Sequence, residues 1–138
     1  MPSPEPRSTR PCPCGLGPSY ADCCRPLHRG RRAGDATAAT AERLMRSRYS
    51  AFAVGRRDYL LATWHPATRP GSLDLDPDLT WERLEIRGTT DGGDGDRAGT
   101  VEFVAHHRDR TTGERGEQHE LSAFVHEDGE WFYVAPRG

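Results

Sequence analysis

The sequence predicts an α+β domain in which helices pack on a curved antiparallel sheet, preceded by a small cysteine-rich segment. Three observations support this: four cysteines lie between residues 12 and 24, apolar residues recur at helical spacing over 41–64, and they alternate with polar residues over 84–133. Helices followed by strands along one chain are typical of an α+β fold, whereas alternating elements indicate a parallel sheet.

The cysteine-rich segment predicts a metal site. It contains every cysteine of the chain: Cys12, Cys14, Cys23 and Cys24. Adjacent Cys23 and Cys24 can form a disulfide only with strain, and Cys12 and Cys14 are poorly spaced for one, although crossed pairings stay open. Clustered thiols in a reducing compartment are more often metal ligands than structural bridges. Zinc fits a four-sulfur site best and iron is second, with His28 as an alternative to Cys24 in the fourth position.

Composition limits the function classes. Hydrophobic residues make up 34% of the 138 residues and the formal charge is −2, so no global field indicates a nucleic acid or a membrane. The chain has no lysine, which excludes Schiff-base catalysis and phosphate-binding Gly-Lys loops. The first ten residues contain no apolar run and no stretch could span a membrane, so we expect a cytoplasmic protein.

These patterns divide the chain into four parts. We expect a disordered tail over 1–11, a small metal-binding knuckle that contains the four cysteines over 12–28, a basic linker over 29–36 and the α+β domain over 37–138. In the knuckle, Gly15 and Gly17 allow the backbone to turn tightly around an ion.

Two helices open the domain. The first is predicted from a Thr40 N-cap to a Gly55 stop, with an apolar face that includes Leu44, Tyr49 and Phe52. A second, shorter helix is predicted to begin near Asp58 and to end before Pro66, because the residue before a proline avoids the helical region.

Four strands follow a loop that is rich in proline and aspartate. The alternating residues are Leu84 and Ile86; Val101, Phe103 and Ala105; Leu121, Ala123 and Val125; and Trp131 and Tyr133. Turn sequences separate them at 91–96, 109–116 and 127–129, which predicts an antiparallel meander.

Specific motifs resemble a known family. The spacing C-x-C-x8-C-C, with Gly15, Gly17 and Tyr20 inside it, is similar to the SEC-C zinc motif at the tail of the SecA translocation ATPase, except that Leu16 replaces the usual small polar residue. The segments 44–52, 59–66, 120–124 and 129–133 resemble the YchJ family of small bacterial proteins. The resemblance implies a nuclear transport factor 2-like (NTF2-like, cystatin-like) cone, zinc held by the four cysteines with Cys24 favoured over His28, and no established activity.

A cone of this kind offers a cavity between helix and sheet. Glu120, Ser122 and Phe124 share one strand face, and Arg46 or Arg48 of the first helix could pair with Glu120 as a structural ion pair. The residues expected to line a ligand pocket are Arg48, Tyr49, Trp64, His65, Glu120, Ser122, Phe124 and Trp131.

Two functions from different classes follow. The first is a zinc-bearing adaptor that docks a protein partner through the knuckle and its neighbouring arginines, which are Arg25, Arg29, Arg31 and Arg32. RNA is a weaker partner, because Tyr20 is the one aromatic residue in the knuckle. The alternative is a small hydrolase or isomerase with structural zinc that uses Glu120, His65 and Tyr49. The exposed sheet face of such a cone permits a homodimer.

Overall fold

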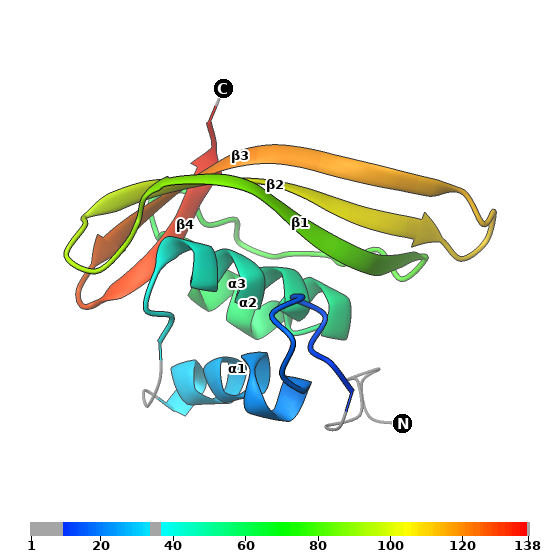
Figure 1. Cartoon of the computed structure of the whole chain (residues 1–138), viewed down its shortest axis with the longest axis horizontal. Coiled ribbons are helices and arrows are strands. Elements are labelled where there is room, and N and C mark those ends of the chain that lie inside the picture. The colour runs from blue at the N-terminus through cyan, green and yellow to red at the C-terminus, as the bar shows by residue number, and fades with distance from the viewer. Residues whose placement is uncertain (1–9, 34–36, 138) are drawn as a thin grey trace.

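The structure is a computed structural model that describes residues 10–33 and 37–137. Helices come first and strands follow, as the sequence predicts (Figure 1). The elements are η1 (Tyr20–Asp22), α1 (Cys24–Ala33), α2 (Ala41–Val54), α3 (Arg57–Ala62), β1 (Leu79–Asp91), β2 (Ala98–Asp109), β3 (Arg115–Glu127) and β4 (Glu130–Pro136). None of the helices in the described ranges has the length and apolar character needed to cross a membrane.

Helix α2 has the predicted ends. The Thr40 hydroxyl accepts a 3.0 Å hydrogen bond from the backbone N–H of Arg43, which satisfies one of the free donors of the first turn. Gly55 ends the helix in the left-handed conformation with φ of 80°, a conformation that glycine adopts without strain.

Helix α3 ends earlier than the proline signal alone predicted. It stops at Ala62, and the backbone then extends along the edge of the sheet. Trp64 forms a parallel bridge with Tyr133, and the N–H of His65 donates to the carbonyl of Tyr133 over 2.7 Å. The chain therefore leaves the helix to pair with β4, before Pro66 requires it to do so.

The sheet is the predicted antiparallel meander, with strand order β1-β2-β3-β4. The β3–β4 hairpin closes through Asp128 and Gly129, whose φ values of 52° and 82° match the two-residue turn that suits the twist of paired strands. Register shifts between Trp81 and Arg83, and again between Ile86 and Gly88, interrupt β1. Such bulges increase the local bend, and the sheet curves over α2 (Figure 1).

The main core lies between α2 and the concave face of the sheet. Leu44, Tyr49, Phe103, Phe124 and Trp131 are among its buried members. On β3 the residues that face this core are Ser122 and Phe124, whereas Leu121 of the predicted apolar alternation is 39% exposed. The alternation correctly identified a strand, but its most apolar residue faces away from the helices, because polar residues of β3 line a cavity on the inner face.

The N-terminal segment corrects one sequence prediction. The basic linker expected over 29–36 is helical as far as residue 33, because α1 continues from Cys24 through the arginine-rich stretch. Arg31 on this helix donates to the Glu130 carboxylate of β4 over 2.7 Å, which holds the helix to the domain. Residues 34–36 and 1–9, on which the rest of the linker prediction and most of the tail prediction fall, lie outside the described residues, as does Gly138 at the end of the predicted domain.

Candidate metal centre and ligand cavity

The structure brings the four cysteines together. The sulfur atoms of Cys12, Cys14, Cys23 and Cys24 all lie within 4.8 Å of one another, and every one of these residues is buried. None of them forms a disulfide. With Tyr20 and Val54 they form a second small core, separate from the main one.

The backbone geometry of the loop between the two cysteine pairs explains how their spacing in the sequence brings the four sulfur atoms together. Gly15 and Gly17 have φ values of 85° and 112°, in the left-handed region that residues with a Cβ rarely adopt. The N–H of Cys12 donates to the Pro18 carbonyl over 2.9 Å and closes the loop. Cys23 and Cys24 then lie at the start of α1, where the helix dipole favours negative charge.

Two arginines of α2 contact the cysteine cluster. The Arg43 guanidinium donates to Sγ of Cys24 over 3.3 Å, to Sγ of Cys23 over 3.4 Å and to the Cys23 carbonyl over 2.9 Å. Arg46 donates to the Cys14 carbonyl over 2.7 Å and pairs with Glu42. Hydrogen bonds from Cys12 and Cys14, followed by those from Ser50 and Arg43, hold the pKa of Cys24 well below its ordinary value. Hydrogen bonds with Cys12 and Cys24 raise the pKa of Cys14 at the same time, so the negative charge of the cluster is concentrated on Cys24, beside Arg43.

His28 has a different role from the alternative ligand role that the sequence left open. It is buried, its Nε2 donates to the Ser47 carbonyl over 2.9 Å, and its Nδ1 accepts from the Tyr20 hydroxyl over 2.8 Å. Its ring also lies 4.6 Å from that of Tyr59. Nδ1 joins His28 to Tyr20 within the knuckle and Nε2 joins the knuckle to α2, so both nitrogens are engaged, and the four sulfurs form a set without His28.

The arginines nearest to the cysteines in the sequence are arranged differently from the two arginines of α2. Arg29 is exposed on α1, Arg25 is half-buried, and Arg31 is paired with Glu130. Nothing is described of the Arg32 side chain. The cations that contact the cysteines come from α2: Arg43 is 19 residues after Cys24, and Arg46 is 32 residues after Cys14.

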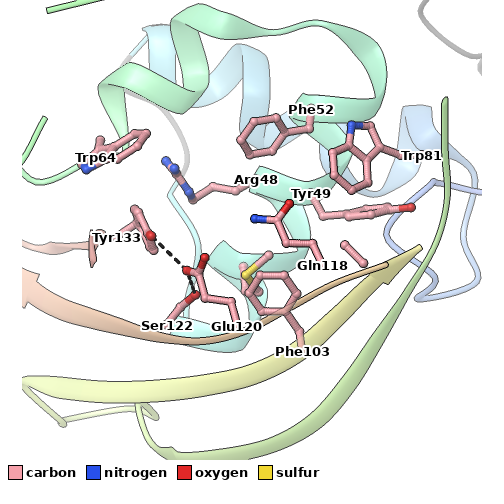
Figure 2. Close-up of a pocket in the computed structure, with 12 residues that line it drawn as sticks. Arg48, Tyr49, Phe52, Trp64, Trp81, Phe103, Gln118, Glu120, Ser122 and Tyr133 are labelled. Atoms are coloured by element: carbon pink, nitrogen blue, oxygen red, sulfur yellow. Dashed lines mark hydrogen bonds between the residues drawn. The ribbon is translucent and has the colours of Figure 1, made fainter. Parts of the chain in front are cut away.

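A cavity of about 250 Å³ opens between α2 and the sheet (Figure 2). Five of the eight predicted pocket residues line it: Arg48, Tyr49, Trp64, Glu120 and Ser122. The remaining lining residues are Met45, Phe52, Trp81, Phe103, Ala105, Gln118 and Tyr133.

Three predicted pocket residues lie elsewhere. Phe124 and Trp131 are almost fully buried in the main core. His65 accepts from the Ala67 N–H over 3.0 Å, donates to Glu127, and packs edge-on against Phe132. The trio of Glu120, His65 and Tyr49 is therefore not assembled around one cavity.

Glu120 is held by hydroxyl donors. Ser122 donates to its Oε2 over 2.5 Å and Tyr133 donates to the same oxygen over 2.9 Å (Figure 2). Burial raises the pKa of Tyr133 above its ordinary value, and the neighbouring Glu120 raises it further, so the phenol stays protonated as a donor.

Arg48 does not form the expected ion pair with Glu120. It is 4% exposed, and its Nη1 donates to the Leu60 carbonyl over 2.7 Å and to the Thr63 hydroxyl over 2.8 Å. Its guanidinium carbon lies 5.2 Å from the Trp64 ring centroid and 4.7 Å from that of Tyr133. Arg46, the other predicted partner, points to the knuckle instead.

Some of the missed cavity residues carried a usable signal. Gln118 lies two positions before Glu120 on the same strand, so the period-two pattern places it on the same face. Trp81 contacts Tyr49 with ring centroids 6.0 Å apart, but the bulge after it breaks the alternation with Leu84 and Ile86. The alternation could therefore not be extended back to it.

Comparisons with known proteins agree with this architecture. Residues 40–136 match the domain described as YchJ, middle NTF2-like domain. A UPF0225 protein of Streptomyces coelicolor is 50% identical over 126 residues, covering 91% of this chain and 94% of its own, and one from Chromobacterium violaceum is 50% identical over 129 residues, covering 90% of each.

Two solved structures share the fold and the knuckle. A SEC-C motif containing protein from Rhodopseudomonas palustris superimposes with a TM-score of 0.77 at 34% identity, covering 94% of this chain and 98% of its own. Another from Psychrobacter arcticus gives 0.78 at 32% identity, covering 94% and 82%. A cysteine knuckle packed on an NTF2-like cone, matched along most of the chain, places this protein in the YchJ (UPF0225) family.

Proposed function

We propose that this protein binds one zinc ion through Cys12, Cys14, Cys23 and Cys24 and uses the zinc-supported knuckle to dock a protein partner. The observation that supports the zinc site is the convergence of four buried sulfur atoms within 4.8 Å of one another. A tetrahedral zinc site with Zn–S bonds of about 2.3 Å has sulfur atoms about 3.8 Å apart, so the cluster can accept the ion with small adjustments.

The donor set also fits zinc chemically. Four thiolates carry more negative charge than one divalent ion neutralises, and Arg43 supplies charge-assisted hydrogen bonds to two of the sulfurs. Four protein ligands leave no open position for a substrate or a water, as in structural zinc sites. The ion would supply a cross-link between the loop and α1. Thiolates of this kind persist in a reducing compartment, which supports a cytoplasmic location.

The docking surface that we propose surrounds the tip of the knuckle loop. Leu16 lies there between two glycines and is 44% exposed, and it is one of two large exposed hydrophobic residues in the described ranges. Arg29 is exposed on the adjoining helix α1 and Arg25 is partly exposed. An apolar contact beside positive charge suits an acidic protein segment that carries an apolar side chain. Tyr20 is fully buried and unavailable for base stacking, which favours a protein over single-stranded RNA.

The zinc site is tested by elemental analysis of the purified protein, with thiol titration before and after chelation. We expect about one zinc per chain, four thiols that react only after chelation, and loss of the ion in Cys23→Ser. A metal-free protein with freely reactive or oxidised thiols would contradict the site and would favour a redox role for the cluster.

The docking proposal is tested with two matched leucine variants. Leu16 and Leu121 are similarly exposed, but Leu121 lies on β3 and Leu16 on the knuckle. A partner captured by cross-linking in cells should be identified, purified and titrated against each variant. We expect Leu16→Ser and the double charge reversal Arg25→Glu, Arg29→Glu to weaken binding at least about tenfold, and Leu121→Ser to leave it unchanged. Equal affinity for all of these proteins would rule out the knuckle as the docking surface.

A further inference from the structure

The cavity between α2 and the sheet combines aromatic side chains with two charged groups. Phe52, Trp81 and Phe103 form much of the apolar lining, and Arg48 and Glu120 lie at the end of the cavity near Trp64 and Tyr133 (Figure 2). Its volume of about 250 Å³ corresponds to roughly eight water molecules of the bulk liquid, at about 30 Å³ each. This is room for a single aromatic ring with one small substituent.

The two charged groups are not equally compensated. Glu120 accepts hydrogen bonds from the hydroxyls of Ser122 and Tyr133, which stabilise its negative charge. Arg48 makes no ion pair within the part of the chain that the structure describes, and its hydrogen bonds run from Nη1 to a carbonyl and a hydroxyl, both neutral. A buried cation without a hydrogen-bonded counter-ion is costly, and the attraction of Glu120, which acts on Arg48 without an ion pair, offsets only part of the burial that lowers the pKa of Arg48.

The geometry around Arg48 leaves part of its donor edge available. Trp64 and Tyr133 contact the guanidinium through their rings and hold its orientation. Among the described residues no hydrogen bond engages its Nε or Nη2, and Arg48 lines the cavity. Nε and Nη2 together form the planar fork that binds a carboxylate with two parallel hydrogen bonds.

We propose that the cavity binds a small planar molecule with one aromatic ring and a carboxylate. The carboxylate accepts from Arg48, and the ring packs between Phe52, Trp81 and Phe103. The ligand would supply a hydrogen-bonded counter-ion, which Arg48 does not have among the described residues. Burial lowers the pKa of Arg48 to about 10, so the guanidinium is still charged at neutral pH.

Three probes of one shape and different charge test this. Benzoate, benzamide and benzamidine are anionic, neutral and cationic, and each is titrated into the zinc-loaded full chain by ligand-observed NMR. We expect benzoate to bind at least about tenfold more tightly than benzamide, because a charge-assisted pair replaces a neutral hydrogen bond, and benzamidine to bind most weakly. Tighter binding of benzamidine, or no binding of any probe, would overturn the proposal.

Substitutions of the two charged cavity residues show which of them binds the carboxylate of the probe. Arg48→Gln should weaken benzoate at least about tenfold, whereas Glu120→Gln should retain or strengthen it by removing a like charge from the cavity. Arg87→Gln on β1, whose side chain is 53% exposed, is the control and should change nothing. If Arg48→Gln proves too unstable to titrate, Glu120→Gln decides: loss of benzoate binding in that variant contradicts the proposal, and retained or tighter binding supports it.

Discussion

The Arg43 guanidinium donates to Sγ of Cys24 across 3.3 Å, from a helix that belongs to the cone to a cysteine that belongs to the knuckle. A second branch of the same side chain contacts both the carbonyl and the sulfur of Cys23. The N–H of Arg43 is also the group that the Thr40 hydroxyl caps at the start of α2. The first turn of α2 therefore positions the cation that faces the thiolates.

Replacing this cation should weaken metal binding. In Arg43→Gln the positive charge next to Cys23 and Cys24 is removed, and we expect zinc affinity to fall about 10- to 100-fold, the range typical of residues that hydrogen-bond to metal ligands. Competition with a chromophoric chelator measures the effect. Arg57→Gln, on the exposed first residue of α3, is the matched control and should bind zinc as the parent does. Equal affinities for the two variants would show that Arg43 is irrelevant to the ion.

Removing the metal should affect the knuckle more than the sheet. The cysteines, Tyr20 and Val54 form a core of their own, and the main core beneath the sheet has no cysteine among its buried members. After treatment with a strong zinc chelator we expect hydrogen exchange to accelerate over residues 12–33. The backbone amides of β2 and β3 should stay protected. Loss of protection across the whole sheet would instead indicate one cooperative unit held by the ion.

The ends of α2 and the clustering of the cysteines could be predicted because their signals are local. Thr40 and Gly55 mark the ends of α2 through their own side chain and backbone, and the cysteine spacing lies within one short loop. The arginines that serve the cysteines could not be predicted in this way. Sequence proximity favoured Arg25 to Arg32, whereas the fold brings Arg43 and Arg46 to the cluster from the next helix.

The cavity residues, too, could be predicted only where the signal is local. Residues on one strand, such as Glu120 and Ser122, follow from the period of two. Trp81 required knowledge of a bulge that the sequence does not mark, and His65 was misplaced because the chain turns onto β4 after α3. Pairing between distant segments decides both cases, and helical or strand periodicity carries no information about it.

His28 should be essential for the attachment of α1. In His28→Phe the Tyr20 hydroxyl loses its buried hydrogen bond to Nδ1, and the Ser47 carbonyl loses one of its two side-chain donors. We expect the free energy of unfolding to fall by about 2–3 kcal/mol, measured by urea denaturation of the zinc-loaded protein. The control is His126→Phe, an exposed residue packed against Trp131, for which we expect less than about 0.5 kcal/mol. Similar losses in the two variants would argue against a special role for His28.

The free energy of unfolding of the parent protein and that of His28→Phe should depend differently on pH. Burial lowers the pKa of His28 from 6.5, so below pH 6.5 the unfolded chain takes up a proton that the folded chain resists. The parent protein therefore loses stability as pH falls below 6.5, by at most about 1.4 kcal/mol per pH unit, until the folded pKa is reached. His28→Phe lacks this loss, so its deficit relative to the parent should narrow between pH 7 and 5. Acid release of zinc affects both proteins and cancels in the comparison; a constant deficit would contradict the burial of a neutral His28.

Two glycines on paired strands test how the sheet meets α2. A Cβ added at Gly99 would lie 2.5 Å from the Cα of Gly92, and the carbonyl of Gly92 accepts from the N–H of Ala41 over 2.9 Å at the start of α2. Moving the Gly92 backbone away would strain that contact, so we expect Gly99→Ala to cost about 1–3 kcal/mol of unfolding free energy. Gly88 on β1 has no atom within 4 Å of such a Cβ and an ordinary φ, so Gly88→Ala should be neutral or slightly stabilising. Urea denaturation of the zinc-loaded variants measures both values. Equal stabilities would mean that the backbone at the end of the β1–β2 hairpin shifts at little cost. The contact between Gly92 and Ala41 would then not fix the sheet on α2, the helix that carries Arg43 and Arg48.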